Sequence, residues 1–244
     1  MVPNEVIIIG GGKSVEEGLS LGLKNHIKDK FVIALNYSYK FFDNTFLCFG
    51  DSEFYKNDNP NKVYPNIYEE LKTLPLIVGM KKNNKITKII HPNTLVLPVN
   101  NNYCGKDGLK KGFYSGFLSG LFSISIGIYL MDFKGTIFLL GYDWSKRTKK
   151  EVNNKEKINI HYYKGIVHRG SQWTDSYEKH NPEGYFKSFL SEKEIKIYNV
   201  NPNSNILTFE KINYKKMFEL LSTRTFEQDS LREFIKIKLL RSSS

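Results

Sequence analysis

Short apolar runs recur along the chain, and several of the stretches between them have the spacing of amphipathic helices. The first run, Glu5 to Ile9, is continuously apolar after its first residue and breaks into three glycines. That pattern is typical of a parallel strand covered on both faces. Further runs that fit strands lie at 31–35, 45–49, 76–78, 94–97, 136–140 and 195–200, and helices are expected at 14–25, 61–73, 114–131 and 183–192. Strands that alternate with helices predict an α/β fold with a doubly wound, mostly parallel sheet.

Two stretches need separate interpretation. Phe113 to Met131 contains 19 residues without a charge, a length that would also suit a membrane span. Seven of these residues are Ser or Gly, and the stretch leads into the strand at 136–140, so we expect a buried helix that crosses the sheet. In the second stretch, polar and apolar residues alternate around Asn83-Asn84, which predicts a hairpin over 81–90.

The residues that follow the strands are the candidates for a site, because ligands of open parallel sheets bind beyond the carboxyl ends of the strands. Gly10, Gly11 and Gly12 would let the backbone approach an anion closely, and Ser14 with Glu17 has the spacing of a capping box. We therefore expect a nucleotide phosphate at residues 10–14. Polar residues also follow other strands, namely Asn36, Asp51, Gly141 and Asp143.

A polar, lysine-rich segment at 146–157 has too little apolar surface to form a core. It precedes a cluster of imidazoles and phenols that contains His161, Tyr162, Tyr163 and His168. A flexible segment that carries such groups is a common way to close an active site, so we expect a lid at about 144–182.

The chain of 244 residues is long enough for one sizeable core, and we expect a nucleotide-binding α/β domain at 1–210 and a basic helical tail at 211–244. The apolar positions of the tail, among them Leu231, Ile235 and Leu239, suit either docking on the domain or peripheral contact with an anionic membrane. The net charge of +11 would attract a polyanion, or it reflects compositional bias. Two cysteines without a disulfide or metal spacing favour a reducing compartment, so we expect a cytoplasmic protein, with the inner membrane face as the alternative.

Taken together, the strand-end motifs resemble those of the bacterial sialyltransferases of glycosyltransferase family 42. Their phage-encoded relatives, described as similar to archaeal 6-hydroxymethylpterin diphosphokinase, share these motifs. The resemblance extends from Val6 to about Phe209. Its matching positions are the loop Gly10 to Ser14, Asn36, Ser115-Gly116, Gly141 to Asp143 and Pro202 to Ser204.

This resemblance implies a single GT-A-like domain of modified Rossmann type. It further implies transfer of a sugar, sialic acid or another, from a nucleotide-activated donor to a hydroxyl acceptor, either a glycan or a modified nucleic acid, with no cofactor required. His168 would be the general base and His161 the second candidate, because imidazole titrates near neutral pH. Tyr162 and Tyr163 would hold the leaving phosphate, and Ser115 with Gly116 would contact the nucleotide.

Two alternatives stay open. Asp51 stands where a sialyltransferase has an asparagine, and a carboxylate beside a phosphate loop could hold Mg²⁺ or a ribose hydroxyl. The first alternative is therefore a Mg²⁺-dependent diphosphotransferase of the 6-hydroxymethylpterin diphosphokinase type, and metal dependence stays open. The second is a protein without catalysis that binds nucleic acid or a membrane surface through its positive charge. The sequence carries no signal for an oligomeric state.

Overall fold

A computed structural model describes residues 2–50, 67–81, 93–100, 105, 112–116, 118–144 and 182–242 of the chain. The expected hairpin at 81–90, apart from Lys81, and nearly all of the expected lid at 144–182 lie outside these residues, as do Asp51, His161, Tyr162, Tyr163 and His168.

The described residues form a nine-stranded sheet in which every strand pair is parallel, as the alternation of strands and helices predicts. The order across the sheet is β6-β5-β4-β3-β2-β1-β7-β8-β9. The strands are β1 (Glu5–Ile9), β2 (Val32–Leu35), β3 (Phe46–Phe49), β4 (Ile77–Lys81), β5 (Thr94–Asn100), β6 (Phe113–Tyr114), β7 (Gly135–Leu140), β8 (Ile195–Asn199) and β9 (Glu210–Lys211). Because all strands run the same way, their carboxyl ends share one edge of the sheet.

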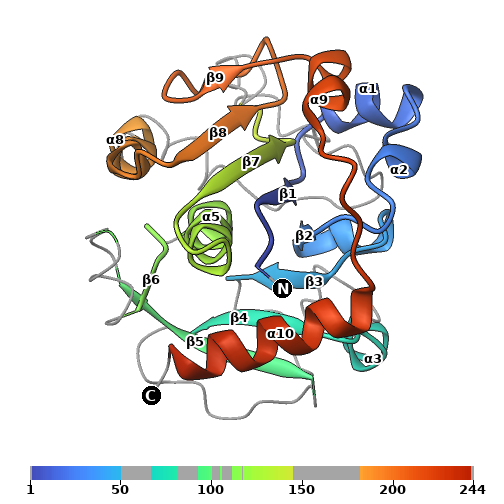
Figure 1. The fold of residues 1–244 in the computed structure, drawn as a ribbon, viewed down its shortest axis with the longest axis vertical. Helices are drawn as coiled ribbons and strands as arrows, with labels where there is room; N and C mark the ends of the chain where they lie inside the picture. Colours follow the sequence, from blue (N-terminus) through green and yellow to red (C-terminus); the bar gives the residue numbers. More distant parts are fainter. Residues whose placement is uncertain are drawn as a thin grey trace, which may run out of the picture.

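Helices cover both faces of the sheet, so the fold is a doubly wound, Rossmann-like α/β fold (Figure 1). One face packs against α5 (Ser119–Leu130) and α8 (Pro182–Lys187), and the other against α1 (Val15–Ser20), α2 (Leu23–His26) and α9 (Tyr214–Leu220). The buried residues of α10 (Gln228–Arg241) join the apolar cluster of the first face. The described part also contains α3 (Ile67–Lys72) and the 3₁₀ helices η1 (Asn36–Lys40) and η3 (Ser188–Ser191). Each face has its own buried apolar cluster, and the central strand β1 contributes to both.

The helix expected at 14–25 is interrupted. It ends at Ser20, and a new helix starts at Leu23 after Gly22, whose φ of 81° lies in the left-handed region that favours glycine. The glycine therefore redirects the chain between two short helices, which periodicity alone does not reveal.

Helix α5 is the buried helix that the uncharged stretch predicts, although it starts at Ser119 because Phe113 and Tyr114 pair with β5. Its small residues bring it close to the sheet: a Cβ on Gly127 would lie 3.1 Å from Val6 Cγ1, and one on Gly120 would lie 3.1 Å from the Tyr142 ring. No helix in the described part of the chain combines the length and the apolarity that a membrane span requires.

The C-terminal residues belong to the same two cores as the rest of the sheet. The boundary expected at residue 210 falls inside β9, and Tyr214 and Met217 of α9 are fully buried beyond it. The apolar face of α10, made of Leu231, Ile235 and Leu239, has no exposed surface. Of the two alternatives for the tail, the structure therefore shows docking on the domain.

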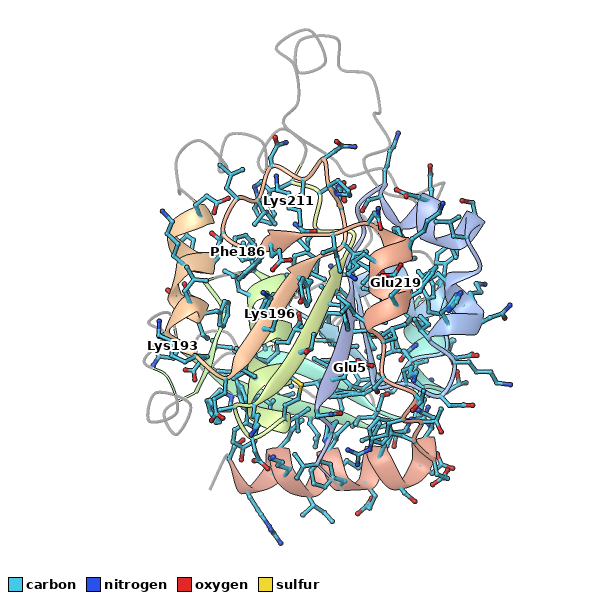
Figure 2. The ribbon with its side chains drawn as sticks, turned by 45° about the horizontal axis from the view of Figure 1, so that its top comes forward. Glu5, Phe186, Lys193, Lys196, Lys211 and Glu219 are labelled. Atoms are coloured by element: carbon cyan, nitrogen blue, oxygen red, sulfur yellow. The ribbon has the colours of Figure 1, made fainter. Side chains whose placement is uncertain are left out.

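Residues 222–238 cross the amino ends of the strands and form side-chain to backbone hydrogen bonds with the residues there. Lys30 Nζ donates to Arg224 O at 2.8 Å, Arg232 Nε donates to Thr45 O at 3.0 Å, and Lys238 Nζ donates to Leu130 O at 3.1 Å. Figure 2 shows α10 at this end of the sheet, beyond the labelled Glu5, while Lys211 marks the carboxyl end. The amino edge is thus covered by the chain's own C-terminal segment.

Candidate functional site

The strand order places a switch point at β1. From β1 the chain adds strands outward to β6 in one direction, then returns to place β7, β8 and β9 on the other side of β1. Connections that diverge from two neighbouring strands leave a crevice beyond their carboxyl ends, where open α/β sheets bind ligands. The loops that border this crevice are residues 10–14 after β1 and residues 141–144 after β7.

The loop after β1 is bonded to the end of β7. Gly10 N donates to Leu140 O at 2.7 Å, and Gly12 N donates to Gly141 O at 3.0 Å. A Cβ on Gly12 would lie 2.5 Å from the Asp143 carboxyl carbon and 2.6 Å from Gly141 O. Both distances are shorter than the distances that Cβ atoms keep from atoms to which they are not bonded. The glycine at position 12 therefore permits the two loops to meet.

The Asp143 carboxylate receives three hydrogen bonds from the loops around it. Ser14 N donates to Oδ2 at 2.9 Å, Ser14 Oγ donates to Oδ1, and Asn201 Nδ2 donates to Oδ1 at 2.9 Å. Asp143 and Asn201 are each only 9% exposed. We call Ser14, Asp143 and Asn201 the carboxylate cluster.

The capping box expected for Ser14 and Glu17 is absent. Ser14 is the N-cap residue of α1, yet its side chain makes no cap hydrogen bond and donates to Asp143 instead. A carboxylate from 129 residues further along the chain binds both the backbone and the side chain of Ser14.

These contacts change what residues 10–14 offer a ligand. The amides of Gly10, Gly12 and Ser14, which the sequence assigns to a phosphate, donate to protein oxygens in this structure. A phosphate in the same place would have to displace a carboxylate of the same charge or share a cation with it.

The loop after β8 supports the carboxylate cluster through hydrogen bonds of Ser204. Ser204 Oγ lies 2.7 Å from Tyr142 O and accepts from Asn199 Nδ2 at 2.9 Å and from Ile206 N at 3.1 Å. Lys211 Nζ donates to Ser204 O at 2.5 Å, which brings a positive charge to the carboxyl edge. Ser204 could be predicted from its place after the strand at 195–200 and from the Pro-Asn-Ser motif, whereas Asn199 and Lys211 have no motif around them.

Tyr142 anchors the same loop to α5. Its hydroxyl lies 3.2 Å from both Ser123 Oγ and Gly120 O, and burial raises the pKa of this phenol far above its ordinary value. The Tyr142 side chain is therefore a neutral structural contact, and the charged group of this loop is the neighbouring Asp143.

Asn36 follows β2 and lies beside the loop after β1, because Ser38 Oγ donates to Gly10 O at 2.9 Å. Its φ of 49° lies in the left-handed region, which asparagine adopts more readily than most residues. Its Oδ1 is buried and has no hydrogen-bond partner among the described residues. The donor that this buried acceptor needs therefore lies outside the described residues, in another part of the chain, a water or a ligand.

Ser115 and Gly116 lie at the end of the outer strand β6 and not at the start of α5. Ser115 N donates to Asn100 O at 3.1 Å, and a Cβ on Gly116 would meet Leu121 and Tyr185. These contacts place the pair between β5 and α8.

The segment that carries His161, Tyr162, Tyr163 and His168 lies outside the described residues and is preceded in the sequence by Asp143 and Trp144. Trp144 directly follows Asp143, and its ring contacts that of Phe186 in α8 edge-to-face, with centroids 5.8 Å apart. Asn205 Nδ2 also donates to Trp144 O at 2.9 Å. Trp144 is therefore held by contacts with α8 and with the loop after β8.

Comparison with known proteins adds no identification, since no family model, no curated protein and no solved structure matches the chain. The resemblance to the sialyltransferases stays a prediction that rests on the strand-end motifs.

The contact between Gly12 and Asp143 can be tested by a double-mutant cycle. We expect Gly12→Ala to destabilise the fold by about 1–3 kcal/mol, because the added methyl overlaps a buried carboxylate and a backbone carbonyl. Asp143→Ala removes one of these obstacles, so the double variant should be more stable than the sum of the two single changes implies. Urea unfolding of the four proteins measures this coupling. Strictly additive effects would mean that the two residues do not meet.

Proposed function

We propose that the protein is a glycosyltransferase that binds a nucleotide-activated sugar at the carboxyl ends of β1, β2 and β7 and transfers the sugar to a hydroxyl acceptor. The observation that supports the proposal is that the side chains at these strand ends offer hydrogen-bond acceptors. Asp143 and Asn36 both offer hydrogen-bond acceptors. Ribose and hexose hydroxyls donate hydrogen bonds, whereas an unprotonated phosphate only accepts them, so a hydroxyl-rich ligand suits this edge better.

Acceptor capacity supports this assignment. An ionised carboxylate has about four acceptor positions, and the described contacts of Asp143 occupy three of them. Asn36 follows the second strand, at the place where dinucleotide-binding folds contact a ribose. We therefore assign the ribose to Asn36 and a further ligand hydroxyl to Asp143, with the phosphates directed away from the carboxylate.

For the chemical step we propose that His168 removes the proton of the acceptor hydroxyl while the acceptor oxygen bonds to the anomeric carbon. The bond from that carbon to the nucleotide phosphate breaks, and its electron pair leaves with the phosphate. Tyr162 and Tyr163 would donate hydrogen bonds to the departing phosphate. The anchoring of Trp144 beside Asp143 supports this proposal, because the segment with these residues starts next to the site.

A second candidate is the Mg²⁺-dependent diphosphotransferase, and Asp143 is the observation that favours it. A phosphate at residues 10–14 would need a cation between itself and this carboxylate, which Mg²⁺ could supply. Activity that disappears with EDTA and returns with Mg²⁺ would favour this candidate over a metal-independent glycosyltransferase. The described residues contain no group of three or more His, Cys, Asp or Glu that could hold a metal ion.

Asn36→Gly tests the nucleoside contact. Glycine accepts the positive φ without strain, so the change removes the side chain and leaves the backbone in place. A thermal-shift screen of CMP, UDP, GDP, ADP and ATP, with and without Mg²⁺, identifies the nucleotide. We expect Asn36→Gly to weaken its binding about three- to ten-fold, the effect of one lost hydrogen bond.

Asp29→Gly is the matched control for this substitution, since Asp29 also has a positive φ, 57°, and is exposed near the amino ends of the strands. The nucleotide affinity of the Asp29→Gly variant should equal that of the unmodified protein. Equal affinity of both variants would remove Asn36 from the site, and no stabilisation by any nucleotide would overturn the proposed function.

The general base can be tested with the nucleotide sugar that the screen selects. We expect His168→Ala to lower single-turnover rates about 10²- to 10⁴-fold, the usual contribution of a positioned base. Nucleotide affinity should change only a few-fold, and His161→Ala should have a smaller effect. A collapsed rate in His161→Ala alone would transfer the role to His161, and normal rates in both variants would contradict base catalysis by either residue.

A further inference from the structure

Most hydrogen-bond donors that border the switch point are already bonded to protein oxygens. Gly10 N and Gly12 N donate to backbone carbonyls at the end of β7, at 2.7 and 3.0 Å. Ser14 donates to Asp143 through both its backbone nitrogen and its hydroxyl. An anionic group of a ligand would need such donors, and it would have to compete with the protein for them.

The side-chain amides at and after the end of β8 are used in the same way. Asn199 Nδ2 donates to Tyr142 O at 3.1 Å, and Asn205 Nδ2 donates to Trp144 O at 2.9 Å. The opposite holds for two acceptors, because the buried Oδ1 atoms of Asn36 and Asn199 have no partner among the described residues. The buried polar atoms that the described part of this edge leaves unpaired are thus acceptors.

The negative charge of Asp143 is not neutralised by a cation within the described part of the chain. Its hydrogen bonds come from Ser14 and Asn201, which are neutral, and no ion pair of the described residues includes it. Lys211 reaches this edge but donates to Ser204 O. Salt screens a charge that is nine-tenths buried much less than an exposed one, so this carboxylate acts on a neighbouring ligand without touching it.

We propose that Asp143 makes the site selective for donors whose sugar is uncharged, such as a neutral hexose, and rejects donors whose sugar carries a carboxylate. The inference rests on the proposed function, which assigns a hydroxyl of the ligand to Asp143. A neutral sugar brings hydroxyl donors to this acceptor, whereas an acidic sugar brings a second negative charge and more acceptors. Sialic acid is an acidic sugar, so this selectivity would separate the chain from the sialyltransferases that its motifs resemble.

Two donors that differ only in the charge of the sugar test the inference by calorimetric titration. If the thermal-shift screen selects UDP, GDP or ADP, the probes are the glucose and glucuronate conjugates of that nucleotide, which differ only in a hydroxymethyl group against a carboxylate. If it selects CMP, they are CMP-sialic acid and its neutral methyl ester. We expect the neutral donor to bind at least about ten-fold more tightly. The net charge of +11 would favour the acidic donor, so the expected preference has to come from a local negative charge.

Asp143→Asn keeps the size of the side chain and removes its charge. The ratio of the two affinities should therefore fall to within about two-fold of one in this variant. Glu17→Gln is the matched control, because Glu17 is an exposed carboxylate in α1, close in sequence to the same loop. Its ratio should equal that of the unmodified protein.

A salt series on the unmodified protein tests the inference even if Asp143→Asn does not fold. The preference should persist between about 50 and about 500 mM salt, since a buried charge is little screened. Equal affinities, a preference for the acidic donor, a preference lost at high salt, or equal effects of the two substitutions would overturn the inference and leave the proposed function in place. Stabilisation by no nucleotide, or by ATP alone, would overturn the proposed function and the inference with it.

Discussion

The hydrogen bonds on the Asp143 carboxylate fix the candidate site, because they join loops from both sides of the switch point. Ser14 belongs to the connection that leads toward β2, and Asn201 belongs to the loop after β8. A carboxylate that is nine-tenths buried needs such partners, since an unpaired charge at this depth would be costly. Gly12 makes the arrangement sterically feasible, and Ser204 holds the loop that supplies Asn201.

The two edges of the sheet have different roles. Residues 222–238 cover the amino edge, where Arg232 and Lys238 donate to backbone carbonyls and Arg224 O accepts from Lys30. At the carboxyl edge two buried polar atoms, Asn36 Oδ1 and Asn199 Oδ1, are left without a described partner. The amino edge is therefore stabilising structure, and the carboxyl edge is where a ligand would complete the hydrogen bonding.

The fold could be predicted from the sequence to a large extent, because apolar runs identify buried parallel strands. The strand at Glu5–Ile9 was predicted at its observed bounds, and the strand after Lys134 within one residue. Strands β6 and β9 were not predicted, since two residues are too few to carry a pattern. The break at Gly22 was also missed, because a glycine inside a helical pattern does not reveal its φ.

The described candidate residues lie at the strand ends, but the contacts between them were not predicted. The rule for open parallel sheets directs attention to the strand ends, where Ser14 and Asp143 are in contact. That they contact each other could not be predicted, since local spacing offered Ser14 a nearer partner in the capping box. The three glycines predicted a phosphate loop because a sequence shows only that the backbone can be approached closely, not by which group. In the structure the group close to Gly12 is the Asp143 carboxylate.

The central claim is that a hydroxyl-rich nucleotide sugar binds where β1, β2 and β7 end. Amide chemical shifts of the isotope-labelled protein, followed during titration with the nucleotide that stabilises it most, measure this directly. The account predicts shifts at Gly10–Ser14, Asn36, Gly141–Asp143 and Asn201–Ser204, with none in α10 at the opposite edge. Saturable shifts that leave these loops unchanged, or no shifts at all, would contradict it.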